Sequence, residues 1–199
     1  MRNEKIEIFI ATSNKNKVKE FKDMLEPKGY SIKSLNDLDE EIEIEENGQT
    51  FEENAIIKAS TIAKKFNIVA ISDDSGLEID ALNKEPGIYS ARYLGHDTSY
   101  DYKNSQILLK LKNETNRDCR YVCSIAICYP SGENHVFTGI LEGSIAYEMT
   151  GSNGFGYDPI FYYEPFKTTL ANVPLDLKNQ VSHRHIALMK LLEYLDAKE

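Results

Sequence analysis

The chain has 199 residues, of which 41% are hydrophobic and 28% charged, a composition typical of a globular protein with one domain or two closely joined lobes. Its formal net charge of −9 argues against broad binding to nucleic acids, because that function requires a basic face. No apolar run is long enough to cross a bilayer, and residues 1–5 lead into a strand-like segment without a signal-peptide core. We therefore expect a cytoplasmic protein without a membrane partner, in which any phosphate ligand meets local cations.

The first predicted elements are a strand and a capped helix. Residues 6–11 predict a short buried strand, and the polar residues after it supply a helix cap. Pro27 and Gly29 end this helix. Its apolar residues share one face: Val18, Phe21 and Leu25.

A second helix is predicted where Thr50 and Glu53 can form a capping box. Residues 68–72 then predict another strand. The helix is expected to bury Ala55, Ala59, Ile62, Ala63 and Phe66.

The remaining pattern alternates strands and helices. We expect strands at 77–82, 120–129 and 136–147, a helix at 100–111, a turn at Pro86-Gly87 and a hairpin turn at Ser131-Gly132. A last helix should start after Ser182 and bury Ile186, Met189, Leu192 and Leu195. The alternation predicts an α/β fold with a mixed sheet, and residues 1–199 show no linker that would separate domains.

The three cysteines lack the paired spacing of a zinc site, and they lie in or beside an apolar, strand-like stretch. Cys119, Cys123 and Cys128 are therefore interpreted as reduced core residues.

An acidic segment spans residues 37–53. Such a run is usually a solvated surface. Here the acidic residues alternate with Ile42 and Ile44, which indicates an extended segment that can aim alternate carboxylates in one direction. This pattern is compatible with a divalent cation.

A polar cluster lies where the first strand ends and the first helix begins. Backbone N–H groups and the helix dipole favour an anion there, and Lys17 adds a full charge. The Gly-rich loop of a Walker motif is missing, and the alternative is an ordinary capped surface helix. The cluster is Thr12, Ser13, Asn14, Lys15, Asn16 and Lys17.

Asp73 and Asp74 follow the predicted strand at 68–72. Adjacent residues of a strand point to opposite faces, so only one of them should enter a given pocket. Together with Glu45 or Glu46, such a carboxylate can coordinate Mg²⁺. This ion prefers a few carboxylate ligands, and its remaining coordination positions are open to phosphate oxygens. The alternative is a turn in which Asp is a cap.

Two further segments combine groups suited to a base and to an anion. Residues 151–159 are rich in glycine and include two aromatic rings, so that a base can stack on Phe155 or Tyr157; the alternative is a loop with core aromatics. Residues 178–184 place Lys178 and Arg184 around the start of the last helix, a second anion-binding surface.

In this order, the segments resemble the inosine triphosphate pyrophosphatase family over nearly the whole chain. Ser13 departs from the family, which often has Gly there. The matching motifs are Thr12 to Lys17, Thr50-Phe51-x-Glu53-Asn54-Ala55, Asp73-Asp74-Ser75-Gly76-Leu77, Pro86-Gly87-Ile88-Tyr89-Ser90-Ala91-Arg92-Tyr93, Gly154-Phe155-Gly156-Tyr157-Asp158-Pro159-Ile160-Phe161 and Ser182-His183-Arg184.

The resemblance implies Mg²⁺-dependent hydrolysis of ITP, dITP and XTP to the monophosphate and pyrophosphate. It implies two lobes around an elongated mixed sheet, a central nucleotide cleft and a homodimer. Asp74 would be the catalytic carboxylate and a metal ligand, with Glu45 as the favoured acidic partner and Glu46 as the second choice. The substrate would be bound by the polar cluster of residues 12–17 and by Ser75, Phe155, Gly156, Tyr157, Asp158, Lys178, His183 and Arg184.

Two other functions stay open. One is a pyrophosphatase for another aberrant nucleotide, and the other is a noncatalytic nucleotide-sensing module. The sensing module would bind ITP without releasing pyrophosphate.

Overall fold

The computed structural model describes residues 6–198. Residues 1–5, for which the sequence predicts no signal peptide, lie outside the described part. One mixed sheet has the strand order β2-β1-β3-β4-β5-β6-β7. β1 pairs in parallel with β2 and β3, whereas β6 pairs antiparallel with β5 and β7. The predicted α/β fold with a mixed sheet is confirmed. The elements are β1 Glu7–Ile10, α1 Lys15–Leu25, β2 Ser31–Ser34, α2 Phe51–Phe66, β3 Val69–Ile79, α3 Tyr100–Lys110, β4 Asp118–Cys128, β5 Asn134–Ile145, β6 Phe161–Tyr163, β7 Thr168–Thr169, α4 Leu175–Val181 and α5 His183–Asp196.

The described residues form two compact units, and between 6 and 198 no helix is long and apolar enough to cross a membrane. The first unit comprises residues 6–74, 124–138 and 187–198. The second comprises residues 75–123 and 139–186. That residues 1–199 act as a single domain stays a prediction.

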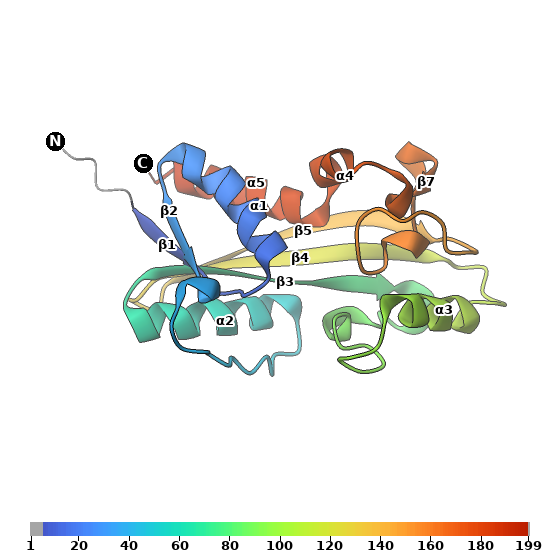
Figure 1. The fold of residues 1–199 in the computed structure, drawn as a ribbon, viewed down its shortest axis with the longest axis horizontal. Helices are drawn as coiled ribbons and strands as arrows, with labels where there is room; N and C mark the ends of the chain where they lie inside the picture. The colour runs from blue at the N-terminus through green and yellow to red at the C-terminus, as the bar shows by residue number, and fades with distance from the viewer. Residues whose placement is uncertain (1–5, 199) are drawn as a thin grey trace. The chain divides into compact units, whose positions relative to one another are not determined.

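In the first unit, α1 and α2 lie on opposite faces of the parallel strands (Figure 1). This follows from the strand order, because α1 leads outward from β1 to β2 and α2 leads back past β1 to β3, and crossovers of one hand then fall on opposite faces. The core under α2 is built from small residues, which allow the helix to approach the sheet closely. Its buried members include Ala55, Ala59, Ala63, Ala70 and Ala126.

The caps of these two helices agree with the sequence. Asn14 caps α1 by accepting from the N–H groups of Asn16 and Lys17. Thr50 caps α2 by accepting from the N–H of Glu53, but the Glu53 side chain accepts from the N–H of Gln49 rather than from Thr50. The predicted capping box is therefore shifted by one residue on its acidic side.

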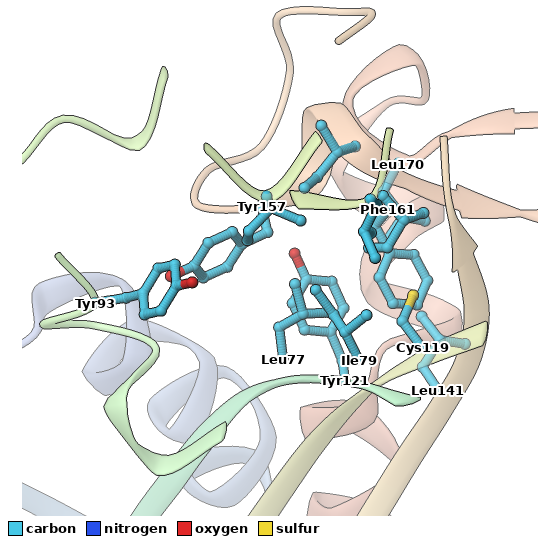
Figure 2. Close-up of a cluster of buried hydrophobic side chains, with 13 residues drawn as sticks. Leu77, Ile79, Tyr93, Cys119, Tyr121, Leu141, Tyr157, Phe161 and Leu170 are labelled. Carbon is cyan, nitrogen blue, oxygen red and sulfur yellow. The ribbon is translucent and has the colours of Figure 1, made fainter. Parts of the chain in front are cut away.

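The second unit is organised around a cluster of buried apolar and aromatic side chains (Figure 2). Tyr121 of β4 and Phe161 of β6 stack with ring centroids 4.4 Å apart. Gly143 of β5 makes room for this stack, because a Cβ there would lie 2.5 Å from the Phe161 ring. Cys119 belongs to the same cluster, and like Cys123 and Cys128 it is buried and forms no disulfide among the described residues, as predicted.

The largest correction concerns β3. The sequence predicts two strands, at 68–72 and 77–82, with a turn at Asp73-Asp74 as one alternative, but β3 runs unbroken from Val69 to Ile79. Its polar middle is accommodated inside the protein because both Asp73 and Asp74 have lysine partners. β2, β6, β7 and α4 were not predicted, since each is short and carries little periodicity.

Two residues predicted to be buried are exposed. Phe66 is 37% exposed at the end of α2, where its ring still stacks on Phe9. Met189 is 42% exposed, because the buried face of α5 is made by its neighbours in the helix. That face consists of Ala187, Leu188, Leu191, Leu192 and Leu195.

Replacing Phe161 by alanine should destabilise the protein by about 3–5 kcal/mol, because it leaves a cavity beneath a stacked ring. Phe155→Ala is the matched control, since this ring is 56% exposed, and it should cost less than about 1 kcal/mol. Both free energies of unfolding are measured by urea denaturation. Equal losses in the two variants would contradict the assigned core.

Candidate functional site

Asp73 and Asp74 occupy consecutive positions in the middle of β3 and therefore face opposite sides of the sheet. The carboxylate of Asp73 is 1% exposed and forms an ion pair with Lys17 of α1, at 2.9 Å. A buried charge is tolerated only with such a partner. The lysine predicted to contact phosphate is thus held by the first of the two carboxylates.

Asp74 lies on the face of α2, where it meets Lys58 and Asn54. The Lys58 ammonium is 3.0 Å from Glu46 and 3.8 Å from Asp74, so two carboxylates flank one cation. The Asn54 amide donates to Asp74 Oδ2 at 3.2 Å, and its carbonyl accepts from the N–H of Gly48 at 2.9 Å. Asn54 therefore ties the acidic segment to the carboxylate of β3.

The surroundings of Asp74 favour its protonated form. Burial raises the pKa of Asp74 to about 6, and the negative charge of Glu46 adds to the increase, while Lys58 and Asn54 oppose it. Burial lowers the pKa of Lys58, but the carboxylates of Asp74, Asp73 and Glu46 outweigh this effect and the net pKa is raised. Asp74 and Glu46 together carry more negative charge than the single ammonium group of Lys58 compensates.

The structure brings Glu46, rather than Glu45, to this group. Glu45 is exposed, and among residues 6–198 it forms no ion pair. Sequence reasoning missed Lys58 and did not assign a site role to Asn54. Their spacing of four residues places both on one face of α2, and this was the available signal.

At the start of α1, part of the predicted anion-binding surface is used by the protein itself. Asn14 Oδ1 accepts from the N–H groups of Asn16, at 3.0 Å, and Lys17, at 3.3 Å. Thr12 accepts from the N–H of Asn14, and the Ser13 carbonyl accepts from Asn36. The side chains of Lys15 and Asn16 are exposed.

In the second unit, Asp158 is the anchor of the glycine-rich loop. It is 1% exposed and accepts from the N–H of Phe155 at 3.0 Å, from the Tyr121 hydroxyl at 3.1 Å and from Lys178 of α4. Gly154 has φ +71°, and a Cβ there would collide with the Asp158 carboxylate. The glycine is needed for this close approach.

The two aromatic residues of the loop have different surroundings. Phe155 is 56% exposed, and the Lys178 ammonium lies 4.4 Å from its ring centroid. Tyr157 is buried and donates to the carbonyl of Ser90 at 2.6 Å, while Gly156 between them accepts from Asn104 at 3.1 Å. A base can therefore stack on Phe155, whereas Tyr157 supports the loop.

The beginning of α5 contributes two buried side chains, His183 and Arg184, to the second unit. The His183 ring stacks on Tyr121 with centroids 4.8 Å apart. Arg184 donates to the hydroxyl of Ser75 at 3.5 Å, next along the chain from Asp74. Phe155, Lys178 and His183 thus form one connected group around Asp158 and Tyr121, while Arg184 contacts Ser75.

Between residues 6 and 198, no group of three or more His, Cys, Asp or Glu side chains is placed to hold a metal ion. Asp74 and Glu46 are the two carboxylates that the structure brings together around Lys58.

Without added metal ions, the Asp74 carboxyl carbon should titrate with a pKa of about 6. Lys58→Met removes the cation that lowers this pKa, so the midpoint should move to higher pH. Lys65→Met is the control, because Lys65 of the same helix pairs with Glu40 instead. The measurement is ¹³C NMR, with the resonance assigned by its loss in Asp74→Asn; a wild-type midpoint at the ordinary value of 3.8 would contradict the assignment.

The comparisons with known proteins agree on one family. A sequence model of the Ham1 family matches residues 8–194. Proteins named dITP/XTP pyrophosphatase from Bacillus licheniformis and Bacillus subtilis are 49% and 47% identical over 193 residues, which cover 96% of this chain and 98% of each relative. The structure of the Staphylococcus aureus Ham1 protein matches with a TM-score of 0.92 at 43% identity, covering 97% of this chain and 100% of that one. A Mycobacterium abscessus structure, described as a nucleoside-triphosphatase / dITP/XTP pyrophosphatase, matches with a TM-score of 0.80 at 38% identity and covers 94% and 99% of the two chains. The resemblance found in the sequence is thereby confirmed, and this chain belongs to the Ham1 family.

Proposed function

We propose that the protein hydrolyses deaminated purine nucleoside triphosphates (dITP, ITP and XTP) to the monophosphate and pyrophosphate, with Mg²⁺ as the cofactor. The observation that carries this proposal is the pair of carboxylates on β3, each joined to a lysine from a different helix. Such an arrangement offers a base and two cations to a triphosphate. Relatives named dITP/XTP pyrophosphatase support the choice of substrate.

The carboxylates present fit Mg²⁺. Asp74 and Glu46 would hold it, because they are hard oxygen ligands and these two carboxylates flank a single lysine, so that a cation would add the positive charge they lack. Two protein ligands suit this ion, which keeps several waters and takes phosphate oxygens. When bound, Mg²⁺ neutralises charge on the phosphates and polarises them toward attack.

The protein groups supply the proton transfer and the remaining positive charge. Without a metal ion the pKa of Asp74 is about 6, so the carboxylate is ionised at neutral pH and can accept the proton of the attacking water. Water then adds to phosphorus as pyrophosphate leaves. Lys17 and Lys58 stabilise the phosphate charges, and Asp73 holds Lys17 in place for this task.

Base recognition is assigned to the second unit. Phe155 provides the exposed ring for stacking, and Lys178, His183 and Arg184 provide donors suited to a 6-oxo group. A 6-amino group would face these donors with donors of its own. Each unpaired buried polar group costs about 1–3 kcal/mol, enough to discriminate against adenine nucleotides.

The proposal also includes two expectations from the sequence, the homodimer and the cytoplasmic location. The enzyme acts as a homodimer in the cytoplasm, where the free nucleotide pool is found. A noncatalytic sensing module is disfavoured by the relatives, which are named dITP/XTP pyrophosphatase. A preference for another aberrant nucleotide would show as a different order of substrates.

Pyrophosphate release should be fast from dITP, ITP and XTP and at least about a hundredfold slower from dATP, by the pairing argument above. Omitting Mg²⁺ should abolish release. Asp74→Asn should lose at least about a hundredfold in kcat because the proton acceptor is gone. Binding of dITP without release of pyrophosphate by the wild-type protein would favour the sensing module.

Glu46→Gln should raise the Mg²⁺ concentration needed for half-maximal activity by about tenfold or more, because a charged ligand is lost. Glu45→Gln is the matched control on the neighbouring residue, and it should change this concentration by less than about twofold because its side chain is exposed. Magnesium titrations of steady-state activity measure both. The reverse order would assign the ligand to Glu45, as first expected from the sequence.

A further inference from the structure

Tyr121 of β4 contacts two residues assigned to the base, although no sequence motif includes it. Its hydroxyl donates to Asp158 Oδ1 at 3.1 Å, and its ring stacks on His183 with centroids 4.8 Å apart. The other ring partner is Phe161, nearly parallel at 8° and 4.4 Å away. A flat ring has two faces, so these two partners hold Tyr121 from both sides. Figure 2 shows Tyr121 within the buried cluster of the second unit.

The hydroxyl completes the surroundings of a buried carboxylate. Asp158 Oδ2 accepts from the N–H of Phe155 and from Lys178, while Oδ1 accepts from Tyr121. Phe155 and Lys178 are the stacking ring and one of the donors proposed for the base. Asp158 itself is 1% exposed, so it acts on a nucleotide by placing these two neighbours.

We propose that Tyr121 is a positioning residue that sets the base selectivity of the reaction, acting through Asp158 on Lys178 and Phe155. This inference rests on the proposed function. It assigns to a core tyrosine a part in telling a 6-oxo purine from a 6-amino purine.

We expect this effect because the two carboxylate oxygens of Asp158 accept hydrogen bonds from different donors. With the hydroxyl present, both carboxylate oxygens are satisfied, and Lys178 lies between the carboxylate and the Phe155 ring. Without the hydroxyl, Oδ1 is left in an apolar wall, and the carboxylate turns to recover a donor. Lys178 and the loop that begins at Phe155 move with it, and the donor is no longer aimed at the base.

The Tyr121 hydroxyl keeps its proton and can therefore donate to Asp158. Burial raises the pKa of Tyr121 well above its ordinary value, and the nearby charge of Asp158 raises it further. The hydroxyl therefore remains a protonated donor at neutral pH.

The test is Tyr121→Phe, which removes one oxygen and keeps both ring stacks. The KM for dITP should rise by about 5–30-fold while kcat changes by less than about twofold, because binding is lost equally in ground and transition states. The ratio of kcat/KM for dITP over dATP should fall by at least about fivefold. Tyr93→Phe is the matched control: Tyr93 belongs to the same buried cluster, but its hydroxyl accepts from Lys110 at 2.7 Å, and the ratio should not change.

A double-mutant cycle with Asp158→Asn tests whether Tyr121 acts through the carboxylate. In the Asp158→Asn background, Tyr121→Phe should change the selectivity ratio by less than about twofold. Independent, multiplying effects of the two substitutions would overturn the proposed route.

The inference fails if folded Tyr121→Phe keeps the wild-type selectivity ratio, and also if loss of the hydroxyl prevents folding, since its role would then be stability. Failure of the proposed function looks different, because the wild-type protein would release no pyrophosphate from dITP. In that case the ratio of equilibrium dissociation constants for dATP and dITP, in wild type and Tyr121→Phe, tests Tyr121 on its own. An unchanged ratio would overturn it there as well.

Discussion

The central constraint is the placement of two consecutive carboxylates inside a strand. Asp73 and Asp74 must point to opposite faces of β3, and each needs a cation on its own face. The strand order provides this, because it puts α1 on one face and α2 on the other, and each helix contributes one lysine, Lys17 or Lys58 (Figure 1). The two helices therefore have to be on opposite faces for the strand to carry both charges.

The second unit also contains a buried carboxylate whose charge must be compensated, but its partners are arranged differently. Asp158 is buried in a loop, and its charge is compensated by Lys178 and by donors from the backbone and from Tyr121. Because the carboxylate uses its own oxygens in this way, it fixes the loop and leaves one ring, that of Phe155, exposed. Burial of Asp158 and exposure of the Phe155 ring are therefore linked.

The helices with strong hydrophobic periodicity could be predicted from the sequence. The glycine-rich loop and the capped start of α1 could also be located from their motifs. Prediction from the sequence failed where local composition and tertiary context disagree. The polar middle of β3 looks like a turn, and only the lysines on both faces allow it to continue as a strand. Glu46 could not be distinguished from Glu45, because that choice depends on where Lys58 of α2 lies. Tyr121 carried no motif, since its contacts come from segments distant in the chain.

The most direct test of the account is the identity of the products. ³¹P NMR of dITP turnover with Mg²⁺ should show pyrophosphate and dIMP appearing in equal amounts from the start. Orthophosphate and dIDP as the first products would mean that the terminal phosphate is removed instead, and the assignment of Asp74, Lys58 and Lys17 to pyrophosphate release would be wrong.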